Sequence, residues 1–243
     1  MAHIWVLFGN PTDEGGRPTK EGLITPNAHG VVLDIGAGVS RSTLISSVGC
    51  QFFPLGHGHT VGYLDRNKVT KYLALEPNTR MHPHIRTTAN SAGFHEEDGT
   101  LVILSCGAED VLSTLEALEA TQPPADTIVS VLTLCTVPSP ERTIRNLVRD
   151  VLRPGGKFLF YEHVLSPRKD VAWWQRAWAP IWAIPFDGCR LDRPIHSWVD
   201  SVTLVEDDGV ETSAWSERRL WGKEGESEEN LWWHQVGKFV KRI

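Results

Sequence analysis

Two glycine clusters stand close together in the stretch LDIGAGVSRSTLISSVGCQFFPLGHGHT, which covers residues 33–60. The first is Gly36-Ala37-Gly38 and the second is Gly56-His57-Gly58. A glycine-rich turn after a buried strand lets the backbone approach a phosphate or a nucleoside closely, because glycine has no side chain in the way. One cluster is enough for such a turn, so the presence of two needs an explanation.

An acidic residue at the end of the next strand usually completes such a site, roughly 20 residues after the glycines, by accepting hydrogen bonds from the ribose hydroxyls. Glu76, which ends the segment YLALE, is the candidate, but it follows Gly38 by 38 residues. Removing Val39–Gly56 shortens this spacing to about 20, the usual value, and joins the two clusters into one. Residues 39–56 are therefore interpreted as an insert that interrupts a single cofactor turn.

The insert also resembles the translation of an intron in one respect. Phe52-Phe53-Pro54-Leu55 requires pyrimidine-rich codons, such as those that precede a 3′ splice site. Two alternatives stay open: a genuine surface loop, or a helix over RSTLISSVG that starts directly after Gly38.

Five apolar segments have the length and composition of buried strands. They are GVVLDIGAG, KYLALEPN, TLVILSCGAED, DTIVSVLTL and KFLFYEHV. Helices are predicted over Ala108–Leu118 and over SPERTIRNLVRDVLRPGG, the latter with Pro140 in its first turn and Gly155-Gly156 at its end. Strands that alternate with helices predict the α/β class, with a doubly wound, mostly parallel, Rossmann-like sheet. Such a sheet binds its ligand at the carboxyl ends of its strands.

The last third of the chain is rich in tryptophan, since nine of the ten tryptophans lie beyond residue 172. It is expected to contain a helix, an irregular lid and substrate region over residues 166–212, and closing strands near 213–221 and 231–240. The tryptophans of WWQRAWAPIW are expected to pack mostly in the core or lid, where two or three could line an apolar acceptor pocket.

Length and composition limit the organisation and the partners. One domain is predicted over residues 1–243, with an N-terminal helix or cap over residues 1–29, where HIWVLFG resembles the end of a longer helix. The net charge of -6 disfavours nucleic acid as a partner, because phosphate binding needs a basic face. No signal peptide and no membrane-spanning run is recognised, so a cytoplasmic location is expected. The sequence makes no prediction of oligomeric state.

The four cysteines, Cys50, Cys106, Cys135 and Cys189, are widely spaced. No CxxC pair occurs, so neither a zinc site nor a redox dithiol is expected, and a reducing cytosol fits best. The pairs His57-x-His59 and His82-x-His84 look like metal ligands, but no carboxylate or cysteine is placed with them. No metal is therefore expected.

The constellation resembles the class I S-adenosylmethionine-dependent methyltransferases over most of residues 30–165. The likeness is carried by the glycine turn, Glu76, CGAED after the third strand and LRPGGKFLFYEH before the fifth. A dinucleotide dehydrogenase is the competing interpretation, but LRPGG leading into the fifth strand is typical of the methyltransferases.

A closer likeness can be named. VLTLCTVPSPERTIRNLVRDVLRPGGKFLFYEHV followed by FDGCRL resembles the methyltransferase-like thiol S-methyltransferases, a branch beside the ubiquinone and menaquinone C-methyltransferases. The sequence departs from that branch in its split glycine motif, and it is expected to lack the branch's amphipathic or membrane-anchoring N-terminal segment.

The resemblance implies S-adenosylmethionine as the cofactor and assigns roles to residues at the strand ends. The turn around the methionine moiety would contain Asp34, Gly36, Ala37 and Gly38, with Gly58 if the motif closes. Glu76 would hold the ribose, and Pro77 and Asn78 would flank the adenosine. Ala108 and Glu109 would lie at the adenine, and Leu132, Thr133 and Leu134 near the sulfonium and the substrate.

Methyl transfer is an in-line displacement that requires alignment and exclusion of water. A thiol acceptor needs little acid–base help, because a pKa near 8.5 leaves a few per cent thiolate at neutral pH. His163 could take a proton or orient the acceptor, or it could be a buried structural histidine. Asp187 and Cys189 could line the acceptor pocket, or form a turn that holds the lid.

The predicted activity is methylation of a small apolar metabolite, with a thiol favoured over an oxygen or nitrogen acceptor. One alternative is a quinone- or lipid-type C-methyltransferase, which would make peripheral contact with a membrane. The other is an inactive methyltransferase-like protein, because the insert interrupts the cofactor turn.

Overall fold

The computed structural model describes residues 15–37, 60–111, 115, 124–184, 186, 188–206 and 209–243. The insert over residues 39–56, together with Gly38, Gly58 and Asp187, lies outside the described residues. Of the helix predicted over Ala108–Leu118, the described residues Val111 and Leu115 are helical, whereas Ala108–Asp110 form a turn before it. Residues 15–24 form a helix within the predicted N-terminal cap.

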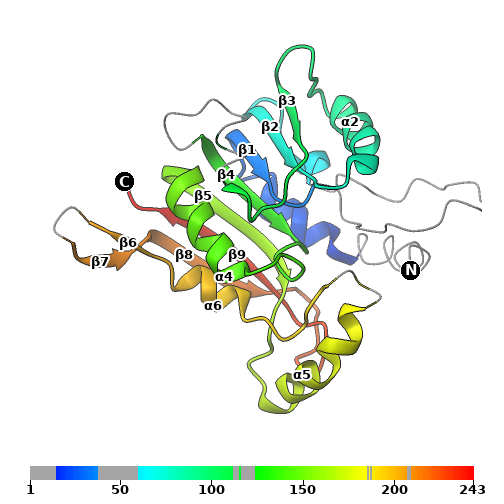
Figure 1. Cartoon of the computed structure of the whole chain (residues 1–243), viewed down its shortest axis with the longest axis vertical. Helices are drawn as coiled ribbons and strands as arrows, with labels where there is room; N and C mark the ends of the chain where they lie inside the picture. Colours follow the sequence, from blue (N-terminus) through cyan, green and yellow to red (C-terminus); the bar gives the residue numbers. More distant parts are fainter. Residues whose placement is uncertain are drawn as a thin grey trace, which may run out of the picture.

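A seven-stranded sheet in the order β3-β2-β1-β4-β5-β9-β8 forms the centre of the molecule (Figure 1). Its strands are β1 (Gly30–Asp34), β2 (Val69–Leu75), β3 (Leu101–Leu104), β4 (Ala125–Val131), β5 (Leu152–His163), β8 (Trp215–Gly222) and β9 (His234–Lys241). The strands β1 to β5 pair in parallel, whereas β9 runs antiparallel to both β5 and β8. The doubly wound, mostly parallel sheet and its two closing antiparallel strands are therefore confirmed.

The strand order reverses between β1 and β4, because β2 and β3 lie on one side of β1 while β4 and β5 lie on the other. In sheets of this kind the ligand binds at the carboxyl ends of the strands, beside the point of reversal. The site predicted from the sequence falls at this edge, because it follows the last residues of β1, β2, β3 and β4.

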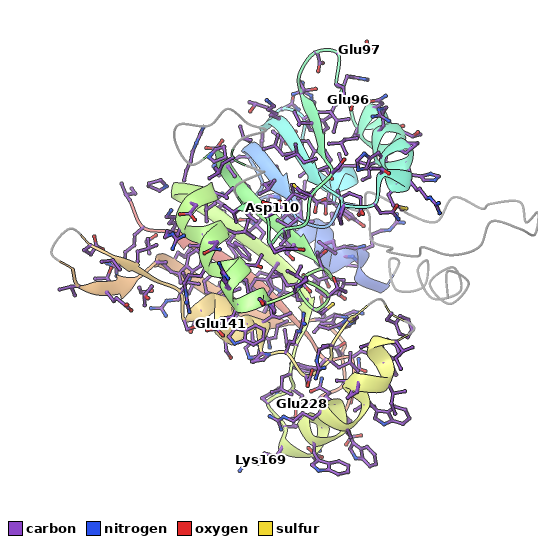
Figure 2. All side chains as sticks on the ribbon, in the orientation of Figure 1. Glu96, Glu97, Asp110, Glu141, Lys169 and Glu228 are labelled. Carbon is purple, nitrogen blue, oxygen red and sulfur yellow. The ribbon has the colours of Figure 1, made fainter. Side chains whose placement is uncertain are left out.

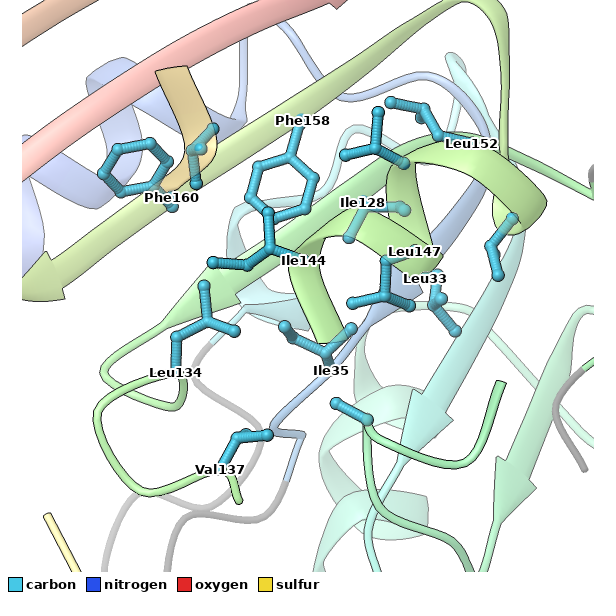
Figure 3. Packing of buried hydrophobic residues seen from close by; sticks show 14 of the residues in the cluster. Leu33, Ile35, Ile128, Leu134, Val137, Ile144, Leu147, Leu152, Phe158 and Phe160 are labelled. Carbon is cyan, nitrogen blue, oxygen red and sulfur yellow. The ribbon is translucent and has the colours of Figure 1, made fainter. Parts of the chain in front are cut away.

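Helices cover both faces of the sheet and bury two apolar clusters against it. One face packs against the helix over residues 15–24, η1 (Val61–Tyr63), η2 (Thr79–Met81) and α2 (His82–Ser91). The other face packs against α4 (Pro140–Asn146), η3 (Leu147–Val151) and α6 (Ile195–Asp200). Figure 3 shows this second interface, where Ile144 and Leu147 lie over Ile128 and Phe158 of the sheet.

The helix before β5 ends earlier than the sequence predicts. It passes from α4 into η3, and β5 then begins at Leu152, so Gly155-Gly156 lie in the first part of β5 and not at the helix end. The pairing of β4 with β5 is irregular at this point, and Gly155 has a φ of 73°, a conformation that favours glycine. The glycines therefore form a bulge that brings the chain back into register.

The predicted irregular lid contains more regular structure than expected. It holds α5 (Lys169–Ala183), α6 and a small antiparallel pair, β6 (Thr203–Val205) with β7 (Glu211–Ser213). Figure 1 shows α5 standing apart from the β1–β3 half of the sheet, at the opposite end of the molecule from α2.

The expectation that the tryptophans of α5 are mostly packed is wrong for three of the four. Trp173, Trp174 and Trp178 are 59%, 51% and 46% exposed, whereas Trp182 is partly buried and stacks on Phe186. The reason is that α5 turns mainly Val171, Ala172, Gln175 and Ala179 inward, so its largest side chains face outward.

Charged side chains of the described residues lie mainly on the outside, although Asp34, Glu76 and Glu162 are buried. Figure 2 labels six of these exposed side chains, which are Glu96, Glu97, Asp110, Glu141, Lys169 and Glu228. Among the described residues, every helix falls short of the length and hydropathy that crossing a membrane would require.

Candidate functional site

The turn after β1 is organised around the buried carboxyl group of Asp34. Its Oδ1 accepts a hydrogen bond of 3.3 Å from the Gly36 N–H, and its Oδ2 accepts one of 2.7 Å from the Tyr72 hydroxyl. Burial, and next the neighbouring Asp34, raises the pKa of Tyr72 well above its usual value, so the hydroxyl keeps its proton and remains a donor. Asp34 therefore shapes the turn from within the protein.

Gly36 brings this turn against the end of β4. A Cβ atom added to Gly36 would clash with Thr133 Oγ1 and lie 2.7 Å from Thr133 Cβ, closer than real side chains pack. The next residue, Ala37, is buried and donates its N–H to the carbonyl of Leu75 at 3.3 Å. The ends of β1, β2 and β4 thus converge, as predicted, around a position that only glycine can occupy.

Glu76 follows β2 directly and is buried. Its Oε1 accepts a hydrogen bond of 2.7 Å from the Asn78 N–H, and Asn78 Oδ1 accepts one of 3.2 Å from the Arg80 N–H. Nε2 of His82 lies 2.8 Å from the carbonyl oxygen of Glu76, which gives that histidine a structural contact at the start of α2. Pro77 is exposed between Glu76 and Asn78.

The segment after β3 places Ala108 inside and Glu109 outside. A Cβ atom on Gly107 would lie 2.6 Å from Cδ of Glu109, so the glutamate side chain folds back over this glycine. Both predicted adenine contacts follow the carboxyl end of β3, where the Glu76 backbone N–H donates to the Leu104 carbonyl at 3.0 Å.

Glu162 in β5 is a functional candidate that the sequence reasoning missed. Its Oε1 accepts hydrogen bonds from the Thr133 N–H (2.8 Å), the Leu134 N–H (3.0 Å) and the Ser130 hydroxyl (2.5 Å). Its Oε2 is buried and has no hydrogen-bond partner among the described residues. Burial raises the pKa of Glu162, although the three donors oppose this shift. An acid inside the mainly apolar segment KFLFYEHV was the available signal.

Leu132 shows how tightly this turn is held. It has a φ of 51°, in the left-handed region that residues with a side chain rarely adopt. Its N–H donates to the Tyr161 carbonyl at 2.9 Å, so pairing with β5 continues up to the residue before Thr133. Such conformations persist only where the surrounding structure imposes them, and they cluster at functional sites.

His163 ends β5 and lies in a buried group with Cys135 and Cys189. Sγ of Cys189 lies 3.3 Å from Sγ of Cys135 and 3.8 Å from Nδ1 of His163. The hydrogen bond with Cys135, together with the adjacent His163, lowers the pKa of Cys189, although burial opposes this. The same contact, with burial, raises the pKa of Cys135. The structure thus joins His163 to two cysteines, one of which the sequence pointed to.

A second histidine, His234 of β9, packs against His163 with ring centroids 4.5 Å apart. Its Nδ1 lies 2.6 Å from Oε1 of Glu226, and the Glu226 carboxylate also accepts the His234 N–H at 2.7 Å. Burial lowers the pKa of His234 to about 4, although Glu226 opposes the shift. Because the acceptor Glu226 faces Nδ1, the neutral ring carries its hydrogen there and leaves Nε2 bare.

Comparison with known proteins gives one family match. The family model described as a methyltransferase domain matches residues 19–194, which is more than half of the chain. Two human enzymes are similar to this chain. Thiol S-methyltransferase TMT1B is 43% identical to it over 76 residues, and thiol S-methyltransferase TMT1A is 45% identical to it over 74 residues. These matches cover 31% and 30% of this chain, and the chain spans about 30% of the length of these relatives.

Solved structures with the same fold are more distant in sequence. A geranyl diphosphate methyltransferase in complex with S-adenosylmethionine has a TM-score of 0.58 at 11% identity, covering 95% of this chain and 85% of the other. An S-adenosylmethionine-dependent methyltransferase from Thermotoga maritima has a TM-score of 0.55 at 14% identity, covering 99% and 94%. At such low identity these structures are similar in fold alone.

Proposed function

The chain belongs to the methyltransferase-domain family, and on that premise we propose that it transfers a methyl group from S-adenosylmethionine to the sulfur of a small apolar thiol. The family and the neighbour solved with S-adenosylmethionine support this cofactor. The observation that carries the thiol acceptor is the likeness to human enzymes named thiol S-methyltransferases.

The convergent strand ends suit the cofactor. Asp34, Gly36 and Ala37 form the turn that would hold the methionine moiety, because exposed backbone at a strand end can approach the ligand closely. Glu76 would accept hydrogen bonds from the ribose, since both oxygens of a carboxylate are acceptors. Ala108 and Glu109 would lie at the adenine.

The group around His163 suits a thiol acceptor. Thr133 and Leu134 would lie near the sulfonium, and Cys135 follows them directly in the chain. The reaction needs alignment and exclusion of water more than proton transfer, and the buried side chains at the end of β5 would contribute to both. His163 would orient the acceptor sulfur. The role given to Asp187 stays a prediction.

A competition between matched acceptors tests the proposal. Thiophenol and phenol are offered separately with S-adenosylmethionine, and formation of methyl product is measured by mass spectrometry. Faster methylation of thiophenol is expected, because a larger fraction of the thiol is ionised at neutral pH. Faster methylation of phenol would favour an O-methyltransferase. Calorimetry with S-adenosylhomocysteine distinguishes both from an inactive protein, which would not bind it.

A quinone- or lipid-type C-methyltransferase is a second candidate, favoured by the exposed Trp173, Trp174 and Trp178 on α5. Tryptophan is enriched where proteins meet the membrane interface, and such acceptors reside in membranes. Sedimentation with lipid vesicles tests this candidate. The double variant Trp173→Ser/Trp174→Ser should then lose sedimentation, whereas equal sedimentation of both proteins would remove the support that α5 gives to this candidate.

A further inference from the structure

Three buried side chains of metal-ligating type meet at the carboxyl ends of β4 and β5. Cys135 lies in the turn after β4, His163 is the last residue of β5, and Cys189 lies between α5 and α6. One ligand atom from each lies within 4.8 Å of the other two. We propose that this Cys135–His163–Cys189 cluster binds one zinc ion and that the acceptor sulfur takes the fourth coordination position. The second half of the proposal rests on the thiol acceptor proposed above.

The geometry of the cluster is close to that of a zinc site. With Zn–S bonds of about 2.3 Å and Zn–N bonds of about 2.0 Å, neighbouring ligand atoms of a tetrahedral ion lie about 3.5–3.8 Å apart. Here Sγ of Cys189 lies 3.3 Å from Sγ of Cys135 and 3.8 Å from Nδ1 of His163. An ion therefore requires the two sulfurs to separate by about half an ångström. The third pair of ligand atoms, from Cys135 and His163, lies within 4.8 Å and must adjust to about 3.5 Å. Both cysteines are free, so both can supply a thiolate.

Hydrogen bonds tie the two cysteine-bearing segments together. Nη1 of Arg193 donates to three carbonyl oxygens of the turn after β4, those of Leu134 (3.2 Å), Cys135 (2.8 Å) and Val137 (2.8 Å). The Arg190 N–H donates to the Cys135 carbonyl at 3.0 Å. The segment that carries Cys189 is thus fixed to the turn that carries Cys135, so the ligands are arranged before an ion binds.

The ring of the third ligand is also held in place. His163 packs against His234, and His234 is itself anchored by Glu226 through a contact of 2.6 Å. Packing against an anchored ring restricts the orientation of the His163 imidazole before an ion binds.

The donor set suits zinc in kind and in charge. Two thiolates balance the double charge of the ion, and a neutral imidazole adds none, so the loaded cluster is neutral inside a buried site. Thiolate ligands select zinc over magnesium or calcium, which prefer oxygen. Three protein ligands with an open fourth position are typical of catalytic zinc, whereas structural zinc has four protein ligands.

An open zinc position supplies the nucleophile that thiol methylation needs. The thiol loses its proton to solvent as its sulfur binds the ion, because coordination deprotonates a thiol outright. The thiolate sulfur then attacks the methyl carbon of S-adenosylmethionine, and a sulfur–carbon bond forms. The bond from that carbon to the sulfonium breaks, and its electron pair stays on S-adenosylhomocysteine. The product is a neutral thioether and a weak ligand, so it dissociates.

Aromatic rings beside the cluster would favour an apolar thiol. The Cys189 N–H donates to the Phe186 carbonyl at 3.0 Å, and the Phe186 ring stacks on Trp182 with centroids 3.6 Å apart. Trp182 in turn meets Trp232 edge to face at 5.2 Å. These rings form an apolar wall next to Cys189, which suits an acceptor such as an aryl thiol.

The metal content of the purified full chain tests the first half of the proposal. The protein is prepared under reducing conditions without chelator, and its zinc content is measured by inductively coupled plasma mass spectrometry. About one zinc ion per chain is expected, with loss to background in Cys135→Ser and Cys189→Ser. Cys106→Ser is the matched control, because Cys106 lies outside the cluster and its variant should keep the wild-type content. Absence of zinc from the wild type, or full zinc in Cys189→Ser, would overturn the proposal.

Cobalt substitution of the wild type tests the second half without any variant that could fail to fold. Co²⁺ in a tetrahedral thiolate site absorbs visible light through d–d transitions and near-ultraviolet light through thiolate-to-metal charge transfer. Addition of thiophenol should change this absorption, and addition of phenol should not. A spectrum that thiophenol leaves unchanged would overturn the fourth position assigned to the acceptor.

Methylation of thiophenol by the same preparations separates this proposal from the proposed function. Zinc-depleted wild type should bind S-adenosylhomocysteine normally and lose methylation at least tenfold. Depleted protein that methylates as fast as the loaded form would overturn the zinc proposal and leave the proposed function intact. Loaded protein that binds thiophenol in its cobalt form, yet transfers no methyl group, would support the site and contradict the proposed function.

Discussion

Glu162 holds the backbone of Thr133, whose N–H donates a hydrogen bond of 2.8 Å to the Oε1 of this buried glutamate. The same oxygen accepts the Leu134 N–H and the Ser130 hydroxyl, so one side chain of β5 fixes the turn that follows β4. Gly36 of the cofactor turn packs directly against Thr133. The position of Glu162 is thereby transmitted to the proposed cofactor site.

Replacing Glu162 with alanine should lower the free energy of unfolding by about 3–5 kcal/mol, because three buried donors lose their acceptor. Glu162→Gln should cost much less, since an amide oxygen can still accept from the same donors. Denaturant unfolding measures both. The control is Glu217→Ala on β8, whose exposed ion pair with Lys238 should contribute at most about 1 kcal/mol. A Glu162→Ala protein as stable as this control would contradict the assigned role.

Gly36→Ala should weaken S-adenosylhomocysteine binding at least tenfold, that is by about 1.4 kcal/mol or more. The added methyl group must displace Thr133 or the turn itself, because its Cβ would lie 2.7 Å from the Thr133 Cβ. Calorimetry gives the affinity. Gly22→Ala is the matched control, since nothing lies within 4 Å of its added Cβ and alanine favours the helix over residues 15–24. Equal affinities of the two variants would show that the close approach is not needed for binding.

Tyr72→Phe should destabilise the protein by about 1–3 kcal/mol, because the buried Asp34 carboxyl loses the donor at 2.7 Å. Denaturant unfolding of Tyr72→Phe, Asp34→Asn and the double variant gives the coupling energy between the two side chains. A coupling energy of about 0.5 kcal/mol or more is expected for groups in direct contact. Additive effects of the two substitutions would mean that the hydrogen bond does not organise the turn.

Glu76→Ala should weaken cofactor binding by about 1.5–3 kcal/mol, because the ribose hydroxyls lose a charged acceptor. The same substitution frees the Asn78 N–H, which donates to Oε1 at 2.7 Å. Glu76→Gln separates the two effects, since the amide oxygen keeps the Asn78 bond while the charge is lost. Unchanged affinity in calorimetry for both variants would remove Glu76 from the site.

Deleting Val39–Gly56 should raise the melting temperature and tighten S-adenosylhomocysteine binding. The prediction rests on sequence spacing, because the deletion restores about 20 residues between the glycines and Glu76. It also removes the apolar Leu44, Ile45, Phe52 and Phe53, which a solvated loop tolerates poorly. The shortened and full chains are compared side by side. A deletion that lowers both quantities would identify the segment as a native part of the fold.

The sequence by itself determined the sheet and the edge where the site lies. Continuous apolar runs such as VVLD and YLAL are typical of strands that are buried on both faces of a parallel sheet, and they form β1 and β2. Carboxyl ends of parallel strands meet at one edge, so Asp34, Gly36 and Glu76 converge as a consequence of topology. The sequence failed at the RPGG bulge and at α5, because composition reveals hydrophobicity but not which helix face finds a partner.

Only the tertiary structure decided the polar interior at the end of β5. Glu162 is 29 residues from Thr133, and no local pattern links a buried acid to the backbone of a distant turn. Cys189 is 54 residues from Cys135 and 26 residues from His163 in the chain. A cluster of these three residues therefore has no short sequence motif, such as CxxC, by which it could be predicted. These side chains meet because β4 and β5 lie side by side and Arg193 ties the following segment to the turn after β4. Such contacts arise from packing between elements, which periodicity along the chain does not encode.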